Sequence, residues 1–175
     1  YLTFDDGPIP EVTPWVLDQL EAYNAQATFF CVGENVEKYP EIYQAVLDRN
    51  HLVGNHTFNH LNGWSTDSKE YLDNITKCAR LVHSDLFRPP YGRLRPSQAR
   101  SLFENYKVVM WDILSGDFDA SLTGEQCWEN VRNNVEPGSV VVFHDSVKAK
   151  DRLYEVLPKT LAYFRERGYV FRGVD

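Results

Sequence analysis

Hydrophobic positions along the chain follow two patterns, short continuous apolar runs and stripes of helical spacing. The continuous runs, typical of buried parallel strands, cover residues 1–4, 27–32, 51–54, 86–88, 106–111, 139–143 and 169–171. Between them, apolar residues three or four positions apart predict helices over residues 10–23, 40–50, 68–81, 96–104, 123–135 and 151–167. This alternation of strand and helix predicts an α/β protein with a parallel sheet.

The 175 residues contain no linker, no low-complexity segment and no break in composition. Hydrophobic residues make up 43% of the chain and charged residues 25%, which are ordinary values for a folded globular protein. We therefore expect one domain over residues 1–175, large enough to bury a sizeable core.

Polar residues recur directly after the predicted strands. They are Asp5, Asp6, His56, Arg88, the segment 112–117 and His144. In a β/α barrel all such positions lie on one face, where the active site is built. A closed or nearly closed β/α barrel therefore explains the pattern better than a doubly wound sheet.

Charge and cysteine content narrow the function classes. The formal net charge is −7 and Lys and Arg form no run, which argues against nucleic acid as a partner. No apolar stretch is long enough to cross a bilayer. Cys31, Cys78 and Cys127 are widely spaced and odd in number, so we expect buried thiols, and neither a disulfide framework nor a zinc finger.

The chain opens at Tyr1 inside a predicted strand, without a Met or a charged n-region, which indicates a trimmed N-terminus. The compartment is therefore left open, with the cell envelope or secretion favoured over the cytoplasm. The sequence does not decide the oligomeric state.

The first polar segment is Asp5-Asp6-Gly7-Pro8, where the Gly-Pro pair ends the strand and turns the chain. The turn can bring both carboxylates to the mouth at the strand's carboxyl end. Two carboxylates there repel each other unless a cation lies with them or one is protonated. An acidic turn in water is the alternative reading of this segment taken alone.

His56 and His60 are four residues apart and share one face if their segment makes a single helical turn. Imidazole is the commonest nitrogen ligand of zinc, although such a pair alone is a weak signal. A carboxylate from the end of the first strand and these two histidines would meet on one face of the barrel. Three protein ligands leave a position open for water, which is the arrangement of a catalytic metal.

Two further segments offer catalytic groups. In Arg88-Pro-Pro-Tyr91, the prolines fix an extended backbone and leave the Tyr91 N–H available to an oxyanion, while Arg88 can pair with a carboxylate. His144 ends a buried strand and can serve as a general acid, with Asp117 as a nearby carboxylate that raises its pKa. In isolation the first segment is equally a rigid surface loop, and a lone histidine is more often a core residue.

Five motifs in this order resemble the polysaccharide deacetylases of carbohydrate esterase family 4, the NodB homology domain. They are Thr-Phe-Asp-Asp-Gly (3–7), His-Thr-x-x-His (56–60), Arg-x-Pro-Tyr (88–91), Asp-Phe (117–118) and Val-x-Val-x-His (140–144). The resemblance covers essentially the whole chain. It implies a distorted (β/α)7-8 barrel, a divalent metal, most often zinc, and hydrolysis of N-acetyl groups on amino-sugar polymers with release of acetate.

The resemblance also implies a role for each matched residue. Asp6, His56 and His60 would bind the metal, Asp5 would be the base oriented by Arg88, and His144 would be the acid tuned by Asp117. The Tyr91 amide would hold the oxyanion, and Val142 would line the pocket of the acetyl methyl group. Tyr91, Trp111 and Phe118, together with Trp64, offer aromatic walls to a sugar, although such residues can equally belong to the core.

Two positions depart from the family pattern. The fourth motif usually reads Asp-x-x-Asp-Trp, and Leu114 and Phe118 stand at its first and last positions here. Because these changes alter the wall of the expected pocket, the sequence does not decide whether the substrate is a chitin oligomer or peptidoglycan. A metal amidohydrolase acting on a small amide, an O-acetyl esterase on the same fold and a glycan-binding protein with an inactive site are the alternatives.

Overall fold

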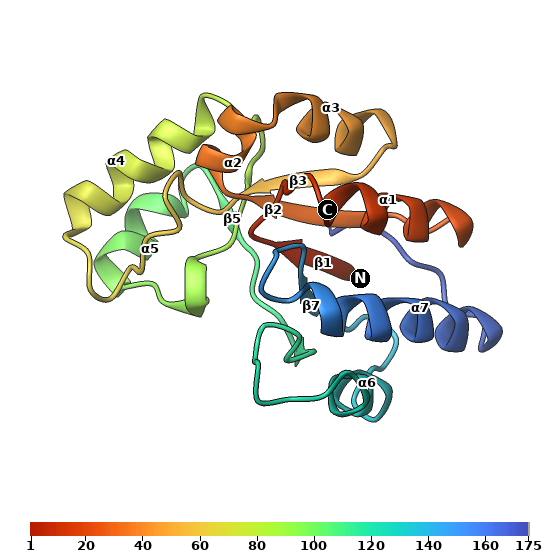
Figure 1. The fold of residues 1–175 in the computed structure, drawn as a ribbon. Coiled ribbons are helices and arrows are strands. Elements are labelled where there is room, and N and C mark those ends of the chain that lie inside the picture. Colours follow the sequence, from red (N-terminus) through yellow and green to blue (C-terminus); the bar gives the residue numbers. More distant parts are fainter. Residues whose placement is uncertain (175) are drawn as a thin grey trace.

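The computed structural model describes residues 1–174 and shows one parallel sheet of seven strands in the order β5-β4-β3-β2-β1-β7-β6 (Figure 1). The strands are β1 (Leu2–Asp5), β2 (Ala27–Cys31), β3 (Leu52–Asn55), β4 (Leu86–Phe87), β5 (Lys107–Val108), β6 (Ile113–Leu114) and β7 (Val141–His144). The helices are α1 (Thr13–Ala22), α2 (Gly33–Lys38), α3 (Pro40–Asp48), α4 (Ser68–Ala79), α5 (Pro96–Leu102), α6 (Gly124–Arg132) and α7 (Lys150–Glu166). The predicted α/β fold is confirmed as a curled half-barrel, with β5 and β6 at its two open edges.

Three details differ from the sequence prediction. The expected strand over residues 106–111 is shorter, because only Lys107–Val108 (β5) pair, with β4, and β6 is an unpredicted strand beyond that range that pairs with β7 at the other edge. Among the described residues, 169–171 forms no strand, and its Phe171 carbonyl instead accepts a hydrogen bond from Gln26 N–H beside β2. The short helix α2 was not predicted, since its six residues carry too few apolar positions to show a period.

The main hydrophobic core lies between the outer face of the sheet and helices α1, α3, α6 and α7. Alternate strand side chains point to opposite faces. In β1, Leu2 and Phe4 enter this core, where the Phe4 ring stacks 5.0 Å from Phe29 and 5.8 Å from Phe143. Thr3 and Asp5, at the positions between them, face the inside of the half-barrel. The outer face therefore stabilises the fold and leaves the inner face for polar side chains.

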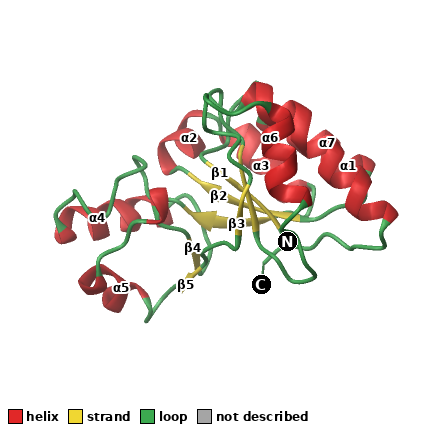
Figure 2. Ribbon diagram, turned by 90° about the horizontal axis from the view of Figure 1, so that it is seen from below, coloured by secondary structure: helices red, strands yellow, loops and turns green. Residues whose placement is uncertain are grey.

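Helices α4 and α5 stand apart from the other helices in the view from below (Figure 2). They enclose a second cluster of buried residues made of Tyr71, Ile75, Phe87 and Leu102. The three cysteines are free and buried, as the sequence predicted. Among the described residues, no helix combines the length and the apolar character that a membrane span requires.

Candidate active site

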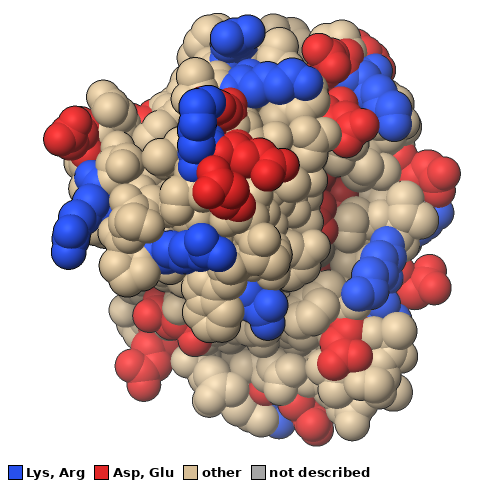
Figure 3. Space-filling model, turned by 90° about the vertical axis from the view of Figure 1, so that its left-hand side faces the viewer, with Lys and Arg blue, Asp and Glu red and all other residues tan. Residues whose placement is uncertain are grey.

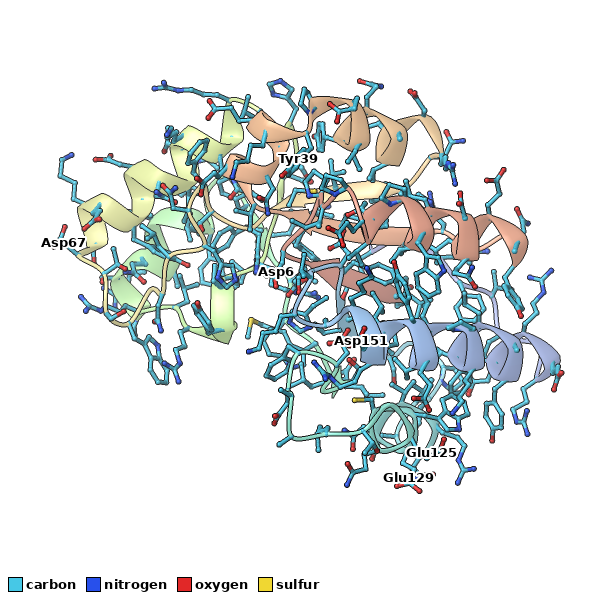
Figure 4. All side chains as sticks on the ribbon, viewed as in Figure 1. Asp6, Tyr39, Asp67, Glu125, Glu129 and Asp151 are labelled. Atoms are coloured by element: carbon cyan, nitrogen blue, oxygen red, sulfur yellow. The ribbon has the colours of Figure 1, made fainter. Side chains whose placement is uncertain are left out.

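Asp6, His56 and His60 converge where the carboxyl ends of β1 and β3 meet. Oδ1 of Asp6 lies 3.2 Å from Nε2 of His60 and 3.8 Å from Nε2 of His56. Figure 4 places Asp6 between the part of the molecule with α4 and α5 and the part with α6 and α7. Strand ends that are remote in sequence thus bring together the predicted carboxylate and both histidines.

The donor set fits a divalent metal. One ligand atom from each of these three residues lies within 4.8 Å of the other two. Oδ1 of Asp6 is buried and makes no hydrogen bond to any described residue, which is costly for a carboxylate oxygen unless a cation faces it. One carboxylate and two imidazoles form a donor set that zinc accepts, with a coordination position left over.

The protonation states agree with this role. Burial lowers the pKa of His56 to about 4 despite the carboxylates of Asp5 and Asp6, so the ring is neutral near pH 7. Its Nδ1 lies 2.8 Å from the carbonyl oxygen of Arg88, which can only accept, so Nδ1 carries the hydrogen and Nε2 keeps its lone pair. Burial alone would raise the pKa of Asp6, but the contact with His60 and the positive charge of His144 hold it well below its usual range.

The segment from His56 to His60 is a loop and not the single helical turn that the spacing indicated. Thr57 and His60 have φ values of 63° and 55°, so the backbone passes twice through the left-handed region. Two amide side chains support this path. Oδ1 of Asn55 accepts from Thr57 N–H at 2.9 Å, and Oδ1 of Asn74 accepts two successive loop N–H groups at 2.7 and 3.0 Å. The histidines therefore converge through side-chain anchors on β3 and α4.

Asp5 is buried beside the triad and is held by Arg88. Nη1 of Arg88 donates to Oδ1 of Asp5 at 2.8 Å and to Oγ1 of Thr3 at 2.7 Å. Nε and Nη2 of the same guanidinium donate to the carbonyls of Val109 and Met110 at 3.1 Å. With one oxygen held by Arg88, the other oxygen of Asp5 faces the triad, 4.0 Å from Nε2 of His56.

The turn after β1 is anchored by Asp145, which the sequence analysis left without a role. Its carboxylate accepts from Gly7 N–H at 3.0 Å and from Thr13 Oγ1 at 2.6 Å. A Cβ on Gly7 would lie 2.0 Å from a carboxylate oxygen of Asp145, so only glycine fits. Burial raises the pKa of Asp145 to about 8, against the effect of the hydrogen bonds that it accepts. This anchor fixes the backbone that carries Asp6.

His144 and Asp117 form a buried pair on the opposite side of the site. Oδ1 of Asp117 lies 2.7 Å from Nδ1 of His144, and Oδ2 accepts from the backbone N–H of His144 at 2.8 Å. Burial lowers the pKa of His144, but Asp117 outweighs it, and with Asp5 and Asp6 it raises the pKa to about 9. Because Asp117 occupies Nδ1, Nε2 is the nitrogen left for a substrate.

Asp5, Asp6, His56, His60 and His144 line one cavity of about 460 Å³, visible as a hollow with acidic atoms deep inside it (Figure 3). The predicted wall residues Tyr91, Trp111, Phe118 and Val142 all line it. The edge of the Phe118 ring lies toward His144, with centroids 5.0 Å apart. Trp64 is not among the described residues that line the cavity, since it lies beside Arg93 instead.

Tyr91 lies on the rim. Its ring is 61% exposed and lies 4.7 Å from the His60 ring, and its φ of 61° is left-handed. The Tyr91 N–H makes no hydrogen bond to any described residue, in keeping with the expected free donor. Tyr91 lies within the short segment Pro90–Gly92, where its φ of 61° and ψ of 9° are not those of a helix and mark a kink.

Three residues that line the cavity were not predicted from the sequence as site residues. They are Leu114, Ser146 and Lys148. Ser146 and Lys148 follow His144 in the loop between β7 and α7. The rule that functional side chains follow the strands of a barrel could have found them, had it been extended past His144. Leu114 was noted only as a departure from the family motif, and its 37% exposure shows that it forms part of the rim.

Comparison with known proteins places this geometry in a family. The family model described as polysaccharide deacetylase matches residues 1–111. A peptidoglycan-N-acetylglucosamine deacetylase of Bacillus cereus is 36% identical over 152 residues, which are 83% of this chain and 55% of that protein. A second Bacillus cereus protein of the same name is 35% identical over 182 aligned positions, covering 99% of this chain and 85% of that protein. The chain thus spans about half the length of one relative and most of the other.

A solved structure agrees with the sequence relatives. It is the crystal structure of a peptidoglycan N-acetylglucosamine deacetylase in complex with 4-naphthalen-1-yl-N-oxidanyl-benzamide. The superposition has a TM-score of 0.92 at 32% identity and covers 99% of this chain and 84% of that chain. The fold, the family model and the relatives lead to one conclusion: the chain belongs to the polysaccharide deacetylase family.

Proposed function

We propose that this chain is a metal-dependent hydrolase that removes N-acetyl groups from an amino-sugar polysaccharide and releases acetate. One observation carries the proposal. His56, a neutral member of the metal-type triad, and His144, whose pKa is raised to about 9, line the same cavity. The buried carboxylate of Asp5 lines this cavity as well. Amide hydrolysis needs both an activated water and a proton donor for the leaving nitrogen.

Asp6, His56 and His60 would hold the metal, and zinc suits their donor atoms best. When bound, a divalent ion supplies Lewis-acid chemistry, polarising a carbonyl oxygen and lowering the pKa of water. Asp5 is placed to take the proton of the attacking water, because Arg88 holds one carboxylate oxygen and leaves the other toward the triad.

The remaining groups complete the proton balance. Water adds to the acetamide carbonyl carbon, its proton goes to Asp5, and the Tyr91 N–H donates to the developing oxyanion. His144 then gives the proton on Nε2 to the nitrogen as the C–N bond breaks, and acetate and a free amine are the products. Each proton-transfer group of this kind contributes roughly 10² to 10⁴ in rate.

The rim favours a polymer over a small amide. Tyr91 and Leu114 are 61% and 37% exposed, so apolar surface continues from the cavity to the outside of the molecule. Sugar rings present apolar faces that stack on such side chains, whereas a small amide is usually enclosed. The two Bacillus cereus relatives act on peptidoglycan N-acetylglucosamine, and we propose a β-linked N-acetylglucosamine chain, of peptidoglycan or chitin type, as the substrate. With such a substrate, we propose the cell envelope or the outside of the cell as the place where the protein acts.

The test is acetate release by the zinc-loaded protein from N-acetylglucosamine oligomers, peptidoglycan and O-acetylated xylan. We expect release from at least one of the two N-acetylated glycans, a rate lower by a factor on the order of 10² to 10⁴ in Asp5→Asn, and little release from the xylan. Release from xylan alone would favour the O-acetyl esterase. If the metal-loaded protein releases no acetate from any of the three substrates, the proposal is contradicted, and a small-amide hydrolase or a binding protein is favoured.

A further inference from the structure

Arg152, in the first turn of α7, reaches two loops of the active site at once. Its Nε donates to the carbonyl oxygen of Asp117 at 2.6 Å, and its Nη2 donates to the carbonyl oxygen of Lys148 at 2.6 Å. The neighbouring residue Asp151 marks this turn in Figure 4. One guanidinium therefore joins the loop after β6, which carries the partner of His144, to the loop after β7, which carries the cavity wall.

The loop after β6 has few bonds to the rest of the sheet. β6 is only two residues long and lies at the edge of the sheet, and the last backbone bond to the sheet runs from the Ser115 N–H to the Val142 carbonyl at 3.2 Å. The Asp117 N–H donates within the loop, to Oγ of Ser115 at 3.3 Å. Gly116 has a φ of 82°, and the Ser115 carbonyl accepts from Nδ2 of Asn130 at 3.1 Å. Asp117 comes directly after this glycine. Without the bond from Arg152, its backbone carbonyl would have no partner among the described residues.

We propose that Arg152 is a positioning residue for the general acid, because it fixes the Asp117 backbone so that the carboxylate meets His144. This inference rests on the proposed function, in which His144 protonates the leaving nitrogen. A 2.7 Å contact between Oδ1 of Asp117 and Nδ1 of His144 requires the carboxylate to be held within a fraction of an ångström. The planar fork of a guanidinium, with donors at fixed angles, can hold two carbonyls in this way, whereas an ammonium group cannot.

A purely electrostatic role of Arg152 and a positioning role predict opposite shifts in the pKa of His144, and this difference can be measured. The charged groups that face His144 are Asp117, Asp5 and Asp6, with the cations Lys148 and Arg152 behind them on the two loops and α7. If Arg152 acted only through its positive charge, removing it would stabilise the imidazolium and raise the pKa of His144. If Arg152 positions Asp117, removing it weakens the bond to Nδ1 and lowers that pKa.

The experiment compares Arg152→Met and Arg152→Lys with the wild type and with Arg167→Met. Arg167 lies at the other end of α7, where its guanidinium stacks on Tyr163, and serves as the matched control. The measurements are the pH dependence of kcat/KM, the NMR titration of His144, zinc content and Tm. The NMR titration needs no substrate, so it tests the positioning even if the chain releases no acetate.

For Arg152→Met we expect kcat to fall about 10- to 100-fold, with zinc content and KM close to wild type. The pKa of His144 should move to lower pH, and Arg152→Lys should recover part of the rate. The control should match the wild type in rate and titration. A His144 pKa that is unchanged or higher in Arg152→Met would overturn the proposal, as would a loss of rate that only follows a loss of folded protein.

Discussion

His56 and His144 occupy corresponding places in the fold and are held in opposite protonation states. Each lies at the carboxyl end of a parallel strand, and each is engaged through Nδ1. The partner of His56 is the Arg88 carbonyl at 2.8 Å, whereas the partner of His144 is the Asp117 carboxylate at 2.7 Å. The pKa is lowered to about 4 in the first case and raised to about 9 in the second.

The difference teaches that burial alone does not assign a role to a histidine. Both rings lose solvation, which lowers the pKa of each. The Arg88 carbonyl does not offset the cost of a buried charge on His56, so this ring stays neutral. The buried Asp117 carboxylate bonds to both Nδ1 and the backbone N–H of His144 and offsets the cost of the buried charge, so His144 keeps its proton. Substitutions that alter one side of this comparison at a time should separate the two roles.

The largest loss of activity should come from removing one of the three metal-type donors. His56→Ala removes one of three donors, so zinc binding and activity should both be lost, while the fold should remain because the triad lies outside the hydrophobic core. Metal analysis, circular dichroism and acetate release check this outcome. His83→Ala, at an exposed histidine, is the control. Full activity in a protein shown to contain no metal would refute the metal assignment.

The next effect concerns the proton-transfer groups. His144→Ala should lower kcat by a factor on the order of 10² to 10⁴, and Asp5→Asn by a similar factor. Zinc content should stay close to wild type in both, because neither residue belongs to the triad. Kinetics on an N-acetylglucosamine oligomer, with metal analysis of the same samples, separates these variants from His56→Ala. Loss of zinc from His144→Ala would contradict the division of roles.

A smaller effect should follow from changing the partner of His144. The wild-type pH profile should fall on the alkaline side as His144 loses its proton, at or below the value of about 9, since a bound dication opposes the imidazolium. Asp117→Asn removes the charge that raises the pKa, so this limb should move to lower pH. The pH dependence of kcat/KM measures the shift. A limb that stays in place would show that Asp117 has another role.

The smallest change in rate should come from a substitution in the cavity wall. Lys148 lines the cavity, is exposed and forms no ion pair with a described residue, so a carboxylate on a neighbouring sugar can meet it. Lys148→Glu should therefore lower the rate on peptidoglycan relative to that on a neutral N-acetylglucosamine oligomer. A factor of roughly two to five is expected for an exposed pair. Equal changes on both glycans would exclude Lys148 as a selectivity residue.

The sequence predicted much of the fold because hydrophobic periodicity is local. It failed between residues 106 and 111, where a continuous apolar run indicated one strand. The structure has Val109 and Met110 outside any ladder, with their carbonyls bonded to Arg88 from a remote segment. It also failed at residues 169–171, where Phe171 and Tyr169 pack against the core without pairing as a strand and Val170 is exposed.

The site was predicted where side chains carry the chemistry and missed where the backbone does. His56 and His60 were singled out from residue type and spacing, and the family resemblance selected Asp6 from the two adjacent carboxylates. The helical turn expected between the histidines was wrong. Asp145 and Arg152 left no signal, because they act by bonding to backbone groups of other loops. Such contacts depend on how two loops approach each other, which no periodicity encodes.

Arg88 has a consequence for anyone who engineers this protein. Its guanidinium bonds at once to the Asp5 carboxylate, to the Thr3 hydroxyl and to the carbonyls of Val109 and Met110, in the segment between β5 and β6. Any substitution would leave several buried acceptors without donors, at a cost of about 1–3 kcal/mol each. Arg88 therefore fixes both the orientation of Asp5 and the segment between β5 and β6, so an Arg88 variant cannot separate a loss of chemistry from a loss of structure. Libraries that aim to change the substrate are best confined to the rim, with this residue left fixed.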